Sequence, residues 1–91
     1  MNAIKLLNEL KVGTPLIVII KSQGTTIREV SLYGGIDDEG IYTFIDNDGI
    51  YRLTTGFIKE HCTISQELDG EDDLLKLTKI IKEVKSEEGV I

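Results

Sequence analysis

The chain has 91 residues, of which 41% are hydrophobic, and its 16 acidic and 10 basic residues give a net charge of −6. This length and composition predict one globular domain, residues 1–91, that can bury about 60–65% of its unfolded surface. The acidity argues against nucleic-acid binding, because contact with phosphates requires a positive surface.

Neither a membrane segment nor a secretion signal stands out along the chain. The longest apolar run, Leu16–Ile20, is far shorter than the roughly 20 residues that cross a bilayer. Cys62 is the single cysteine, so no internal disulfide can form, and a reducing compartment fits. We therefore expect a cytoplasmic protein that does not bind membranes.

The first eleven residues are predicted to form a short helix. Ile4, Leu7 and Leu10 fall at three-residue steps, which is the spacing of one helix face. Pro15 cannot continue a helix, so the helix predicted over residues 1–11 ends before it.

Two strands are predicted to follow this helix. Leu16–Ile20 is apolar at every position, which is typical of a strand that is covered on both faces. Thr25–Tyr33 forms the second strand, with apolar and polar residues alternating in its second half. The Gly34–Gly35 pair behind it suits a sharp bend.

The next stretch contains two similar nonapeptides, Ile36–Phe44 and Ile45–Leu53. Each begins with an acidic turn that a glycine closes and continues into a run of β-branched and aromatic residues. This pattern predicts two successive hairpins, with strands over residues 41–45 and 50–54.

Three further elements complete the chain. Residues 55–60 are predicted to form a short 3₁₀ turn, and residues 62–65 a fifth strand with its first and third side chains facing inward. Leucine, isoleucine and valine at three- and four-residue spacing predict an amphipathic helix over residues 70–87. Its stripe is Leu74, Leu77, Ile81 and Val84, widened by Leu75 and Ile80. We expect this stripe to pack on the chain's own barrel; the alternative, which the sequence leaves open, is that the helix offers it to a partner.

The order and spacing of these elements over residues 12–66 resemble SH3-like and Sm-like small β-barrels. The first Sm motif is echoed by Val18, Ile20, Gly24, Ile36, Asp37 and Asp46, and the second by Thr55–Ile58. The resemblance implies a mainly β, α+β fold. We expect a five-stranded barrel over residues 15–66, flanked by the N-terminal helix and by the C-terminal amphipathic helix.

The sequence offers little for catalysis or metal binding. It contains one histidine and one cysteine, and no glycine-rich loop that would hold a phosphate. The acidic turns lack the Asp-x-Asp-x-Asp-Gly spacing of calcium loops. We therefore predict no catalytic residue, no cofactor and no metal ligand, and we do not expect an enzyme.

The candidate partner-binding residues are Tyr33, Tyr42, Tyr51 and Arg52. Tyrosine is favoured at binding surfaces, and the resemblance implies peptide binding through surface aromatics. The alternative is that the tyrosines belong to the core with their hydroxyls at its rim, because Tyr42 shares a strand face with Phe44.

Three functions remain open at this point. The first is a small, acidic, cytosolic and non-catalytic module that binds a protein partner. The second, implied by the Sm resemblance, is a homo-oligomeric barrel whose edge strands pair between subunits and which binds RNA. The third is an acidic inhibitor, of the kind that mobile elements encode, that mimics nucleic acid. Its phosphate-like track would be Asp37, Asp38, Glu39, Asp46, Asp48 and the Asp69–Asp73 run.

Overall fold

The structure, a computed structural model, describes the backbone of residues 2–89 and the side chains of residues 2–84. Residues 1, 90 and 91, which the predicted domain includes, lie outside the described part. The helices are Ala3–Glu9 (α1), Thr55–His61 (α2) and Gly70–Gly89 (α3). The strands are Pro15–Ser22 (β1), Thr25–Ile36 (β2), Tyr42–Asp46 (β3), Gly49–Leu53 (β4) and Cys62–Ser65 (β5).

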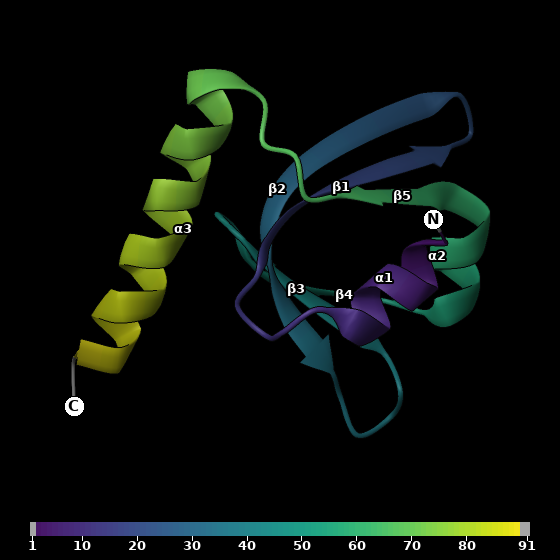
Figure 1. Ribbon diagram of the computed structural model, residues 1–91, viewed down its shortest axis with the longest axis horizontal. Coiled ribbons are helices and arrows are strands. Elements are labelled where there is room, and N and C mark those ends of the chain that lie inside the picture. The colour runs from purple at the N-terminus through teal and green to yellow at the C-terminus, as the bar shows by residue number, and fades with distance from the viewer. Residues whose placement is uncertain (1, 90–91) are drawn as a thin grey trace.

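The five strands form one antiparallel sheet in the order β4-β3-β2-β1-β5. Figure 1 shows α3 on one side of this sheet and α1 with α2 on the other. The α+β class, the five strands and both terminal helices are therefore confirmed. Helix α1, at Ala3–Glu9, is shorter than the predicted residues 1–11.

The sheet is open, so the closed barrel of the prediction is not confirmed. Within the described residues, β4 and β5 lie at opposite ends of the strand order and do not pair with each other. Helix α2 gives the physical reason. The predicted 3₁₀ turn over residues 55–60 is wrong, because Thr54 caps a seven-residue α-helix there. A helix of that length advances the chain by about 10 Å and keeps the two strands apart.

Strand β1 lies inside the sheet, paired with β2 on one side and β5 on the other. This confirms the expectation from its unbroken apolar run. Leu16 and Val18 point to one face and Ile17 to the other, because successive strand side chains alternate; all three are fully buried. Both faces of the sheet therefore need a covering layer, and the helices supply it.

The first face packs against α1 and α2. Its buried residues are Leu7, Leu16, Val18, Tyr33, Tyr42, Phe44 and Ile58. Cys62 and Ile64 of β5 pack against this cluster, as the predicted inward orientation required. Ile58 of α2 is fully buried there, whereas the neighbouring Phe57 is half-buried and packs against the His61 ring.

The glycine pair bends β2 as predicted. The pairing of β2 with β3 shifts by one residue between Tyr33 and Gly35, which is a β-bulge. Gly35 has φ +87°, a conformation that glycine adopts without strain. A Cβ on Gly34 would lie 2.5 Å from the hydroxyl oxygen of Thr43, so this position has no room for a side chain.

The second face packs against α3. Its buried cluster consists of Ile17, Val30, Leu32 and Ile80, so the helix docks on the chain's own sheet, as expected. The predicted stripe is wrong at Leu74 and Leu75, which are 53% and 61% exposed. Its other members do face the sheet; they are Leu77, Ile80, Ile81 and Val84.

We predict that Ile80→Ala lowers the free energy of unfolding by about 2–5 kcal/mol, because it leaves a cavity between α3 and the sheet. Urea unfolding followed by circular dichroism measures this loss. Leu75→Ala, at a position that is 61% exposed on the same helix, is the matched control and changes stability by less than about 0.5 kcal/mol. Equal losses in the two variants would contradict the docked position of α3.

Candidate interaction surfaces around the C-terminal helix

An ion pair between an exposed arginine and a buried aspartate fixes the start of α3 on the sheet. Arg28 of β2 donates two hydrogen bonds to the Asp73 carboxylate, Nη1 to Oδ1 at 2.7 Å and Nη2 to Oδ2 at 2.6 Å. The backbone N–H of Asp69 donates to the same carboxylate at 2.6 Å. Asp73 is only 2% exposed, so its charge depends on these partners. The sequence places this residue in a run of acidic residues and gives no sign of its burial.

This arrangement holds the pKa of the Asp73 carboxyl far below its ordinary value of 3.8. The main cause is the Arg28 guanidinium, followed by the hydrogen bond from Asp69; burial acts in the opposite direction. Asp73 in turn raises the pKa of Arg28. Both groups are therefore charged across the whole neutral range, and α3 is anchored by a bidentate pair.

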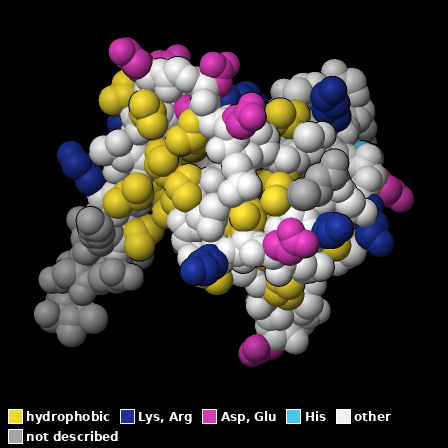
Figure 2. Space-filling model, in the orientation of Figure 1, with side chains coloured by type: hydrophobic (Ala, Val, Ile, Leu, Met, Phe, Trp, Pro, Cys, Tyr) yellow, Lys and Arg dark blue, Asp and Glu magenta, His cyan; other side chains and the backbone are white. Residues whose placement is uncertain are grey.

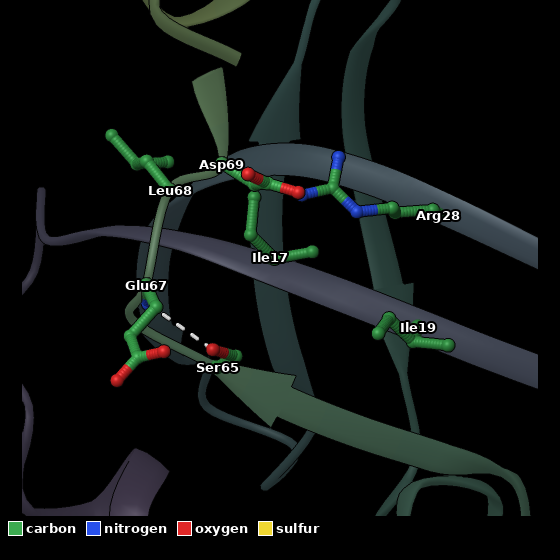
Figure 3. A pocket seen from close by; sticks show the side chains of 7 residues that line it. All are labelled: Ile17, Ile19, Arg28, Ser65, Glu67, Leu68 and Asp69. Carbon is green, nitrogen blue, oxygen red and sulfur yellow. Dashed lines mark hydrogen bonds between the residues drawn. The ribbon is translucent and has the colours of Figure 1, made fainter.

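A hollow of about 270 Å³ adjoins this anchor (Figure 3). Its floor is apolar and comes from Ile17 and Ile19 of β1, while Leu68 stands beside it. Arg28 and Asp69 point toward one another across its mouth (Figure 3). Because Arg28 is committed to Asp73, this hollow presents no free cation to an anionic ligand.

The outer side of α3 carries a second apolar feature, which we call the leucine face and define as Leu74 and Leu75. These side chains are 53% and 61% exposed. With Glu71 and Thr78 they line a shallow hollow of about 230 Å³. Figure 2 shows hydrophobic side chains gathered along α3 and beside it, with acidic side chains at the end where the helix begins.

The three candidate tyrosines all lie on the face of the sheet that packs against α1 and α2. Tyr33 and Tyr42 are 2% and 5% exposed, so little of either ring is open to a partner. The Tyr42 hydroxyl donates to Oδ1 of Asn8 at 3.0 Å. Tyr51 is half-buried and stacks on Phe44.

The Tyr51 hydroxyl shares a hydrogen bond of 2.7 Å with the Ser31 hydroxyl. Burial is the main cause that raises the pKa of Tyr51 above its ordinary value. The phenol is therefore protonated at neutral pH and acts as a structural hydrogen-bonding group.

Arg52, the fourth candidate, is exposed but already paired. Its guanidinium lies 2.5 Å from Oδ2 of Asp37 and 3.2 Å from Oε2 of Glu39. Asp37 also accepts hydrogen bonds from the backbone N–H groups of Ile41 and Glu39, and the first of these contributes most to lowering its pKa. The structure thus brings Arg52 to the β2–β3 turn and does not join it to the tyrosines in one surface.

These ion pairs also bear on the acidic track of the inhibitor hypothesis. Asp37 and Glu39 share Arg52, and Asp73 is paired with Arg28. Three carboxylates of the track therefore have cationic partners within the chain. Asp46 and Asp48, at the β3–β4 turn, lie at another place on the surface.

Cys62 lies in a hollow of about 460 Å³ between the two short helices, lined by Asn2, Ala3, Ile58, Lys59 and Cys62 itself. Burial raises the pKa of the Cys62 thiol, so the neutral thiol predominates near pH 7. Among the residues that the structure describes, no group of three or more histidine, cysteine, aspartate or glutamate side chains is placed to hold a metal ion.

Comparisons of the chain with protein-family models, curated proteins and solved structures found no match in any of the three. Over residues 2–89, none of the helices has the length and apolar character to span a bilayer.

We predict that Asp73→Asn destabilises the protein at pH 7 and flattens the acid side of its stability profile. The folded-state pKa of Asp73 lies below the ordinary value, so its contribution is present above about pH 4 and is lost as pH falls further. Asp72→Asn, an exposed neighbour on the same turn, is the control. The urea unfolding midpoints of both variants are measured between pH 7 and about pH 2.5. The same pH dependence in the two variants would contradict the ion pair of Asp73 with Arg28.

Proposed function

We propose that this chain is a small, acidic, non-catalytic protein-interaction module that binds its partner through the leucine face of α3. The observation that carries the proposal is the exposure of Leu74 and Leu75 on a helix that is already docked by other residues. Neither leucine is needed to hold α3 on the sheet. Two adjacent exposed leucines are the kind of apolar anchor that binding surfaces use.

The energetic case rests on the area that these side chains leave in water. Burying a whole leucine side chain gains about 1.5–3 kcal/mol, and more than half of each side chain is still available for burial. An interface needs further contacts around such a centre, with a polar rim that excludes water. The hollow above Ile17 and Ile19, near the start of α3, offers a further apolar surface next to Leu68.

Charge indicates the chemistry of the partner. The α3 start carries Glu71, Asp72 and Asp69, and the whole chain has a net charge of −6. Complementary potentials speed association and suppress wrong partners. The partner is therefore a protein with an apolar spot that basic side chains surround.

A second candidate, the Sm-like homo-oligomer, has one observation in its favour. The described sheet ends in two different edge strands, β4 and β5, that have no strand beside them on their outer sides. Head-to-tail pairing of two unlike edges generates rings when the rotation closes. Only the resemblance to Sm-like barrels supports RNA binding by this oligomer, and the negative net charge of the chain opposes it. The third function, an acidic inhibitor that mimics nucleic acid, stays a prediction.

The leucine face is tested with the double variant Leu74→Ser/Leu75→Ser. Tagged wild type and variant are purified from cells that express the chain, and co-purifying proteins are quantified by mass spectrometry. We expect at least one partner to fall by about tenfold, the effect of losing roughly 1.4 kcal/mol of apolar contact. Val12→Ser, at a site that is 71% exposed near the end of α1, is the control.

Equal recovery of every partner with wild type and the double variant would refute the leucine face. Far-UV circular dichroism must show that both variants are folded. Light scattering after gel filtration separates the two candidates, since a particle of 10.1 kDa is a monomer and removes the ring.

A further inference from the structure

A groove runs between α3 and the hairpin that β3 and β4 form, on the side of the helix away from Leu74. Its volume is about 340 Å³. The lining residues are Ile45, Asp46, Gly49, Ile50, Ile80, Glu83 and Val84. We call it the hairpin groove.

The hairpin groove has an apolar floor and an apolar wall. Ile80 at its base is fully buried, and Ile45 and Val84 are half-covered. Ile50 forms the wall on β4 and is 72% exposed. Ile50 sits directly across from Ile45 in the hairpin register, so both side chains stand on the same face of the sheet. Ile50 is thus an exposed apolar side chain held in a fixed position at the edge of a hollow.

The rim of the groove is acidic. Asp46 and Glu83 line it from opposite sides, and Asp48 follows at the hairpin turn. None of the residues that line the groove is a lysine or an arginine, so its lining contributes negative charge alone.

We propose that the hairpin groove binds a basic segment of a partner protein, with a leucine-like side chain against Ile50 and an arginine or lysine at the rim. The apolar hollow supplies the anchor, and the carboxylate residues Asp46 and Glu83 of its lining supply the complementary charge. An acidic or uncharged segment gains only the apolar contact.

This site does not include the leucine face, which lies on the opposite flank of α3. The two surfaces can therefore succeed or fail separately. If both are used, α3 separates two binding regions, one on each side of the helix.

The probe is a capped hexapeptide that contains two arginines and two leucines. One matched peptide carries glutamates in place of the arginines, and another carries serines in place of the leucines. Each is titrated into ¹⁵N-labelled full-length protein and followed by amide shifts in NMR spectra. We expect the basic apolar peptide alone to shift the amides of Ile45, Gly49, Ile50 and Val84.

Two variants sharpen the test. Ile50→Ser weakens binding of the basic apolar peptide by about tenfold, because it removes a nearly whole apolar side chain from the contact. Glu83→Gln weakens it by about two- to fivefold, as expected for a rim charge, and higher salt shrinks that difference. The controls are Ile27→Ser and Glu60→Gln, at exposed positions on β2 and α2.

The proposal is overturned by equal binding of the glutamate peptide, by shifts that map to the leucine face, or by no shift at millimolar peptide. It is also overturned if self-association through Ile50 explains the shifts, which a dilution series without peptide detects. Failure of the hairpin groove does not refute the leucine face, because the test of that face uses variants of Leu74 and Leu75.

Discussion

The ion pair between Arg28 and Asp73 determines how the last helix lies on this protein. A buried carboxylate without its cation is strongly destabilising, so α3 must present Asp73 to β2. An α-helix turns by about 100° per residue. Once Asp73 faces the sheet, Leu77, Ile80 and Val84 face it as well, and Leu74 and Leu75 are carried away from it.

The same constraint creates both candidate surfaces. The rotation of α3 about its own axis exposes the leucine face on one flank of the helix. On the other flank it places Ile80 and Val84 in the lining of the hairpin groove. The leucine face lies on α3 alone, whereas the hairpin groove lies between α3 and the β3–β4 hairpin. The position of each surface depends on a contact between residues that lie 45 positions apart in the sequence.

Local patterns predicted much of the framework. The apolar run Leu16–Ile20 indicated a strand covered on both faces, the Gly34–Gly35 pair indicated the bend, and the repeated nonapeptides indicated two hairpins. Each of these signals rests on neighbouring residues. Closure of the sheet does not, because it depends on how far α2 carries the chain between β4 and β5.

The candidate sites were harder to predict for a related reason. Two alternative sets of α3 residues fit one helix face almost equally well. The first set is residues 74, 77, 81 and 84, and the second is residues 73, 77, 80 and 84. The choice between them is made by Arg28, which lies outside the helix. Ile50 likewise looks like an ordinary strand residue, and only the position of α3 shows that it borders a groove.

The central claim is that α3 rests on the sheet of its own chain with Ile80 inward. Methyl NOE spectroscopy tests this most directly, in a sample that mixes isotope-labelled and unlabelled protein. The account predicts NOEs from the Ile80 methyls to Val30 and Ile17 within one molecule. Contacts seen only between differently labelled copies, or none between α3 and the sheet, would contradict it.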